Sequence, residues 1–249
     1  MNIKASVKLL LFVFGFNTTY TQVFPVIIES DDIWSVKENI DSNAKHPVVI
    51  FDIDNTLLRA ELVMARDECF DARLKQELAA GLAIKPACDK VLPGYFEAMQ
   101  VTHVSLVDEN SVAMIKELQE RGIVVIALTA RSPHVLEECT LRQLESVGIN
   151  FRITSPTHEK DLNFAGLTDR ADFKGGVIFC GCNDKGKVLE RFFNETDLHP
   201  DQIIFTDDKE KNLSAVEREA NELNIPCVCI RYSKLDQAIQ GFDLTQLEQ

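Results

Sequence analysis

The stretch VVIFDIDNT, residues 48–56, joins a short apolar run to an acidic, polar one. A short run of apolar, β-branched residues is typical of a buried strand, which is predicted here over Val48–Ile53. Two carboxylates, Asp52 and Asp54, lie at the end of this strand. Side chains alternate along an extended chain, so the two carboxylates would share one face if the strand geometry continues.

The same alternation of apolar strands and helical segments continues along the chain. Helices are predicted from about Val112 to a stop at Gly122, from Ser132 (N-cap) and Pro133 to Gly148, and over Lys187–Phe193, Leu213–Leu223 and Ser233–Gln240. Further strands are predicted at Ile123–Leu128, Phe151–Thr154, Val177–Cys180, Ile203–Thr206 and Cys227–Ile230. This order predicts an α/β fold, a doubly wound parallel sheet with helices on both faces.

Polar residues follow several of the predicted strands. Thr129, Ala130 and Arg131 come after the second strand, Lys185 precedes a later helix, and Asp207 and Asp208 follow another strand. Ligands of doubly wound sheets bind beyond the carboxyl ends of the strands. These residues are therefore the candidates for a functional site.

Together these residues resemble the four signature motifs of the haloacid dehalogenase superfamily, in its phosphatase-like branch, and the chain is similar to exported bacterial proteins of this kind. The resemblance runs from about Val48 to Leu213, and both the order and the strand context of the motifs agree. Each motif alone would be weak evidence. The matching residues are Asp52, Asp54 and Thr56 in the first motif, Thr129 in the second, Lys185 in the third, and Asp207 with Asp208 in the fourth.

The resemblance implies a Mg²⁺-dependent phosphomonoester hydrolase. Asp52 would attack phosphorus and form an aspartyl-phosphate, which divides hydrolysis into two easier steps. Asp54 would give a proton to the leaving oxygen and later take one from water. The implied Mg²⁺ ligands are the Asp52 carboxylate, the Asp54 backbone carbonyl and Asp207, with Asp208 helping directly or through water.

The negative charge of a phosphoryl group also needs stabilising groups. Thr129, Ala130, Arg131 and Lys185 are the candidate phosphate-binding residues. Two alternatives stay open on the sequence: Lys187 competes with Lys185 for the lysine role, and Arg131 could instead form a surface ion pair. Asn212 stands where members of the superfamily often carry a second aspartate, and it could orient Lys185 or a ligand water.

The chain of 249 residues fits one core domain with a small insertion. The core is predicted over residues 23–58 and 102–249. Residues 59–101 are predicted to form a helical cap, broken near Gly81, Pro86, Pro93 and Gly94. The segment from 154 to 176 is predicted to add a loop or a hairpin.

The first residues resemble a secretory signal peptide. Lys4 and Lys8 precede an apolar run, Leu9–Phe16, which is too short for a membrane span. We therefore predict a signal peptide at 1–22 and a periplasmic or secreted protein without a stable membrane span. Of the seven cysteines, Cys69 and Cys88 are the first candidates for a disulfide in an exported protein.

The net charge of −13 argues against a nucleic-acid partner, because polyanions would be repelled. The predicted partner is a small phosphorylated metabolite. Two other functions remain open on the sequence: a secreted binding or effector protein on a catalytically idle scaffold, and a phosphotransferase that uses a second alcohol in place of water.

Overall fold

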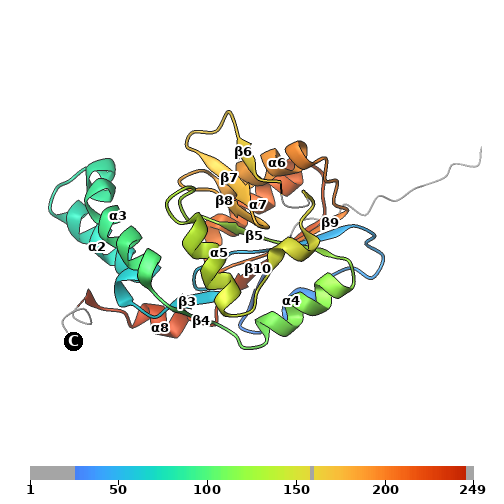
Figure 1. The fold of residues 1–249 in the computed structure, drawn as a ribbon, viewed down its shortest axis with the longest axis horizontal. Helices are drawn as coiled ribbons and strands as arrows, with labels where there is room; N and C mark the ends of the chain where they lie inside the picture. Colours follow the sequence, from blue (N-terminus) through green and yellow to red (C-terminus); the bar gives the residue numbers. More distant parts are fainter. Residues whose placement is uncertain (1–25, 158–159, 245–249) are drawn as a thin grey trace, which may run out of the picture.

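The computed structural model describes residues 26–157 and 160–244 (Figure 1). Within these ranges an eight-stranded sheet has the strand order β1-β10-β9-β2-β5-β8-β7-β6. The strands are β1 (Val26–Ser30), β2 (Pro47–Phe51), β5 (Val124–Thr129), β6 (Leu162–Phe164), β7 (Ala171–Lys174), β8 (Val177–Phe179), β9 (Gln202–Asp207) and β10 (Cys227–Tyr232).

The strands from β1 to β8 in this order pair in parallel, whereas β7 and β6 pair antiparallel at one edge. The predicted mostly parallel α/β sheet is confirmed. The pair β6–β7 also confirms the hairpin alternative for the segment from 154 to 176.

Helices cover both faces of the sheet (Figure 1). On one face, Val49 and Phe51 of β2 pack with Met114 of α4. On the other face, Ile50 of β2 packs with Phe192 of α6. The alternation of side chains along β2 therefore fills two cores, as expected for a central strand. The helices of the domain are α1 (Ser35–Glu38), α4 (Ser111–Glu120), α5 (Glu137–Ser146), α6 (Lys185–Thr196), α7 (Glu210–Glu222) and α8 (Asp236–Gln240).

Two further helices project from the sheet at the left of Figure 1. They are α2 (Asp67–Ala79) and α3 (Ile84–Val101), preceded by the short turn η1 (Val63–Ala65). The antiparallel strands β3 (Leu58–Ala60) and β4 (Val104–Leu106) join them to the rest. The division into core and cap at 59–101 stays a prediction. The predicted break at Gly81 is confirmed, since it lies between α2 and α3. The predicted breaks near Pro86, Pro93 and Gly94 are wrong, because α3 runs through all three residues.

The predicted strand at Phe151–Thr154 is wrong. These residues form the 3₁₀ turn η2 (Phe151–Thr154). Both edges of β5 are already paired, with β2 on one side and β8 on the other, so no place beside it is left for another strand. Instead, the Thr154 hydroxyl accepts a hydrogen bond from the Val125 backbone N–H at 3.1 Å.

The predicted helix start at Ser132 and Pro133 is also wrong. The helix α5 begins at Glu137, because His134 adopts a left-handed backbone with φ of 65°. L-residues in this region cannot continue a right-handed helix. Glu137 Oε1 accepts the His134 backbone N–H at 2.8 Å, which holds the chain just ahead of the helix.

The predicted disulfide between Cys69 and Cys88 is wrong, since both are free thiols. Cys69 is buried in α2, whereas Cys88 is partly exposed on α3. Cys180, Cys227 and Cys229 are buried free thiols, whereas Cys182 is exposed.

Among the residues from 26 to 157 and from 160 to 244, no helix is long and apolar enough to cross a membrane. The predicted signal peptide at 1–22 lies outside the described residues.

Candidate active site at the carboxyl edge of the sheet

Neighbouring strands bring two aspartates together. Asp52 follows β2 and Asp207 ends β9, and Phe51 lies beside Thr206 in the register of the two strands. The Asp52 backbone N–H donates to the Thr206 carbonyl at 2.8 Å, which extends the pairing by one residue. The two carboxylates therefore emerge side by side where the strands end.

Lys185, the first residue of α6, connects these aspartates. Its Nζ donates to Asp52 Oδ1 at 2.6 Å and to Asp207 Oδ2 at 2.7 Å. All three residues are buried, with Asp52 only 6% exposed. A buried lysine between two carboxylates offsets charge that would be costly without a partner.

A close approach of two helices fixes the start of α6. A Cβ atom on Gly186 would lie 2.2 Å from the Ala215 carbonyl oxygen of α7, so only glycine fits there. This contact sets the position of the Lys185 backbone. Lys187 faces elsewhere: its Nζ lies 2.9 Å from Glu219 and 3.3 Å from Glu222, both on α7. The structure thus brings Lys185, and not Lys187, to the aspartates.

Asp207 is held by several donors. The Asn212 side-chain amide donates to both carboxylate oxygens at 3.0 Å, and the Lys209 backbone N–H donates to Oδ1 at 2.7 Å. Asn212 therefore orients Asp207, and its side-chain amide donates to this carboxylate instead of contacting Lys185, one of its two predicted partners.

Asp208 differs from its neighbour. Its backbone N–H donates to Thr56 Oγ1 at 3.1 Å, but its buried Oδ1 has no hydrogen-bond partner. Burial, together with the charges of Asp52 and Asp207, raises the pKa of Asp208 to about 9. Burial also raises the pKa of Asp52 to about 7, although Lys185 opposes this shift.

These carboxylates form a cluster that suits a divalent cation. One oxygen from each of Asp52, Asp207 and Asp208 lies within 4.8 Å of the others. An unpartnered buried carboxylate oxygen is costly, and a bound cation would satisfy it. Oxygen ligands of this kind fit Mg²⁺.

Asp54 is engaged by Arg131. The Arg131 Nε and one terminal nitrogen donate to the two oxygens of Asp54, both at 2.8 Å, in a bidentate pair. The other terminal nitrogen donates to Thr140 and Gln143 of α5, at 2.9 Å and 2.7 Å. Arg131 is buried, so the alternative of a surface ion pair is wrong.

The other predicted phosphate-binding residues lie at the end of β5. Thr129 is buried, and its hydroxyl accepts the Arg131 backbone N–H at 3.2 Å. Ala130 is exposed. The backbone geometry thus brings Thr129 and Arg131 together, but most Arg131 donors already have protein partners. Phosphate binding by this segment stays a prediction.

A polar link between α2 and the sheet was missed from the sequence. Lys209 pairs with Asp67, the first residue of α2, and the Tyr95 hydroxyl of α3 donates to the same carboxylate at 3.1 Å. Lys209 directly follows the acidic pair, which was the only available signal. Nothing in the sequence indicates that a lysine at 209 meets an aspartate at 67.

A family model described as "Protein of unknown function (DUF2608)" matches residues 29–248. Similar curated proteins include two named "Putative outer membrane protein", from Chlamydia trachomatis serovar D and Chlamydia muridarum. Each is 23% identical over 185 residues, which cover 74% of this chain and 68% of the relative.

Among solved structures, a haloacid dehalogenase-like family hydrolase from Streptococcus pneumoniae is similar with a TM-score of 0.46. It is 10% identical, and the match covers 78% of this chain and 98% of that chain.

Proposed function

This chain belongs to the DUF2608 family of proteins of unknown function, and we propose that it is a Mg²⁺-dependent phosphomonoester hydrolase with Asp52 as its nucleophile. One observation carries the proposal: buried Lys185 contacts Asp52 and Asp207, while the buried Oδ1 of adjacent Asp208 has no hydrogen-bond partner. Burying these charged groups lowers the free energy of unfolding unless a bound ion or substrate offsets the cost, which favours a functional role for the cluster.

The residues that would hold Mg²⁺ are Asp52, Asp207 and Asp208, together with the Asp54 backbone carbonyl that the resemblance implies. The bound ion would neutralise charge on the phosphoryl oxygens. Lys185 would add a positive charge on the same side and keep Asp52 in place through its 2.6 Å hydrogen bond.

The reaction would proceed in two displacements at phosphorus. In the first, an Asp52 carboxylate oxygen bonds to phosphorus while the bond to the ester oxygen breaks, and Asp54 gives that oxygen a proton. In the second, water attacks phosphorus, its proton returns to Asp54, and the bond from Asp52 to phosphorus breaks. The net change consumes one water and yields an alcohol and inorganic phosphate.

Arg131 would position Asp54 for this proton transfer. Its bidentate pair fixes the carboxylate, and its contacts with Thr140 and Gln143 tie that position to α5. Proton donation by Asp54 requires one of these two hydrogen bonds to open when substrate binds.

The test is hydrolysis of p-nitrophenyl phosphate by the chain lacking residues 1–22, with Mg²⁺ and with EDTA. We expect turnover with Mg²⁺, none with EDTA, and a loss of about 10⁴-fold or more in Asp52→Asn. Asp71→Asn is the matched control, because Asp71 is exposed on α2. Equal activity in Asp52→Asn and Asp71→Asn would refute the assignment of the nucleophile.

A second candidate is a binding protein on a catalytically idle scaffold. Its support is the closed state of the site, where Asp52 is 6% exposed and Asp54 is held by Arg131. Beryllium fluoride, a phosphoryl mimic, separates the two candidates. A Mg²⁺-dependent complex that Asp52→Asn abolishes supports the hydrolase, whereas folded protein that forms no complex and has no turnover supports the idle scaffold.

We also propose that the protein is exported. The support is the basic start followed by the apolar run Leu9–Phe16, together with the names of the Chlamydia relatives. The test is the mass of the protein recovered from fractionated cells. Removal of about 22 residues and recovery outside the cytoplasm are expected, and full-length protein in the cytoplasm would refute export.

A further inference from the structure

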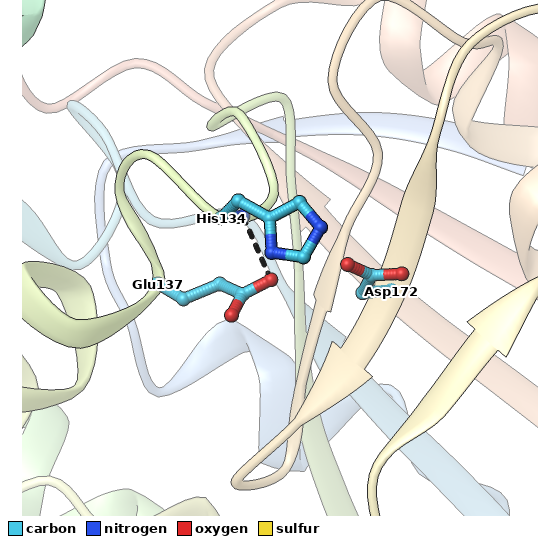
Figure 2. Close-up of side chains that lie close together, drawn as sticks. All are labelled: His134, Glu137 and Asp172. Atoms are coloured by element: carbon cyan, nitrogen blue, oxygen red, sulfur yellow. Dashed lines mark hydrogen bonds between the residues drawn. The ribbon is translucent and has the colours of Figure 1, made fainter.

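A second group of metal-ligand side chains lies outside the aspartate cluster. His134 precedes α5, Glu137 is the first residue of α5, and Asp172 lies on β7. One ligand atom from each lies within 4.8 Å of the others. Figure 2 shows the imidazole ring and the two carboxylates converging from these separate segments.

The hydrogen bonds of the group leave ligand atoms available. Glu137 Oε1 accepts the His134 backbone N–H at 2.8 Å, and Asp172 Oδ2 accepts Arg170 Nε at 2.7 Å. The second oxygen of Asp172, Oδ1, is buried and has no hydrogen-bond partner, and the residue as a whole is only 4% exposed. An unpartnered oxygen of this kind calls for a positive or hydrogen-bonding partner.

Two basic residues near the group do not supply that partner. Arg170 occupies the other oxygen of Asp172. Lys174 lies 3.5 Å from Glu137 Oε2 but bonds more closely to Glu138 Oε1, at 2.6 Å. The three carboxylates of Glu137, Glu138 and Asp172 outnumber these two cations, so the group retains negative charge that favours a metal ion.

We propose that His134, Glu137 and Asp172 form a second metal site for a first-row divalent cation such as Zn²⁺. One imidazole nitrogen with two carboxylate oxygens suits Zn²⁺, whereas the all-oxygen cluster of Asp52, Asp207 and Asp208 suits Mg²⁺. Three protein ligands leave a fourth tetrahedral position for water or another ligand. His134 is exposed, so the site is open to solvent on that side.

The site would tie three parts of the fold together. The loop after β5, the start of α5 and the edge hairpin that contains β7 each contribute one ligand. Because Arg131 and its partners Thr140 and Gln143 belong to the same loop and helix, ion binding would stabilise the segment that holds Asp54. The site does not depend on the proposed hydrolase activity.

The experiment is calorimetric titration of the purified chain with Zn²⁺, in excess Mg²⁺ and with a phosphine reductant. Excess Mg²⁺ would compete with Zn²⁺ for the aspartate cluster, so one tightly bound equivalent of Zn²⁺ is expected at the second site. His134→Gly removes the imidazole and accepts the left-handed backbone, so the fold is retained. We expect it to weaken Zn²⁺ binding at least tenfold, as does Asp172→Asn.

Two controls share the chemistry of the site without belonging to it. Glu145→Gln removes an exposed carboxylate elsewhere on α5, and Cys182→Ser removes an exposed thiol. Both are expected to bind Zn²⁺ as the unaltered chain does. The proposal is overturned if the unaltered chain binds no Zn²⁺ under these conditions, if His134→Gly binds it with unchanged affinity, or if Cys182→Ser abolishes binding.

Discussion

The carboxyl edge of the sheet buries charged side chains, whereas the projecting helices α2 and α3 expose apolar side chains. At the sheet edge, charged groups are buried: Lys185 is 3% exposed and Asp207 is fully buried. On the two helices, apolar groups are exposed, with Ile84 at 60% and Val101 at 70%. Lys85 of α3 pairs with Asp89, and its side chain is 83% exposed.

This contrast shows that the contribution of a charged side chain to the free energy of unfolding depends on its surroundings. A buried charge without its partner costs several kcal/mol, while an exposed ion pair contributes about 0–1 kcal/mol. The sheet edge should therefore be sensitive to single charge changes, and the projecting helices should tolerate them.

The largest effect is expected from Lys185→Met. It leaves Asp52 and Asp207 buried without a cation, which should lower the free energy of unfolding by about 3–5 kcal/mol in EDTA. Lys85→Met on α3 is the matched change, expected to cost less than about 1 kcal/mol. Urea unfolding measures both, and equal midpoints in the two variants would break the comparison.

Arg131→Met should follow in size. It leaves Asp54 without its bidentate partner and Thr140 and Gln143 without a donor, at a cost of about 2–4 kcal/mol. Hydrolysis should also fall, since Asp54 loses its orientation. Arg142→Met removes an exposed arginine of α5 and is the control for both readouts. A variant as stable and active as the control would show that Arg131 does not position Asp54.

The link between the two regions should have an intermediate effect. Asp67→Asn removes the ion pair with Lys209, whose side chain is 31% exposed, so solvent screening limits the cost to about 1 kcal/mol. The effect should concentrate in α2 and α3, seen as faster amide hydrogen exchange there than in β9. Uniform acceleration over the whole chain would mean that the projecting helices do not open separately.

The same link gives a pH dependence. Burial alone would raise the pKa of Asp67, but Lys209 and Tyr95 together hold this pKa below its ordinary value. A depressed carboxyl pKa stabilises the fold above the unfolded value of about 3.9, and this contribution disappears as the pH falls through the folded pKa. The stability difference between the unaltered chain and Asp67→Asn should therefore shrink in acid.

The smallest effect is expected from Val101→Ser. Val101 is 70% exposed at the end of α3, so the free energy of unfolding should change by less than about 0.5 kcal/mol. Met99→Ser, two residues earlier and buried, is the contrast and should cost about 2–5 kcal/mol. Thermal melts compare the two, and a large loss in Val101→Ser would show that this surface is covered.

The sequence was sufficient for the centre of the sheet. The strands β2, β5, β8, β9 and β10 follow from continuous apolar runs, because parallel strands covered on both faces need them. The edge strand β1 and the short hairpin β6–β7 carry weaker patterns, since the side chains of an edge strand are partly exposed to solvent. Residues 151–154 were predicted as a strand because the local sequence pattern contains no information about pairing. Both edges of β5 are already paired, with β2 and with β8.

The candidate site divides in the same way. Asp52, Thr129 and Asp207 lie at strand ends, and the parallel topology alone is enough to place them near one another. The ion pair between Arg131 and Asp54 depends on a seven-residue loop ahead of α5. The sequence did not predict this loop, because Ser132 and Pro133 resemble the start of a helix. The pairing of Asp67 with Lys209 depends on how two distant segments dock, and no local pattern encodes that.

The position of β1 bears on how the chain is made. Val26 aligns with Val228 of β10, so the earliest described strand pairs with the latest one. During synthesis, β1 has no partner until nearly the whole chain has left the ribosome, since strand pairing across such a sequence separation comes late. The strand β1 therefore cannot complete its pairing in the sheet before β10 has been made.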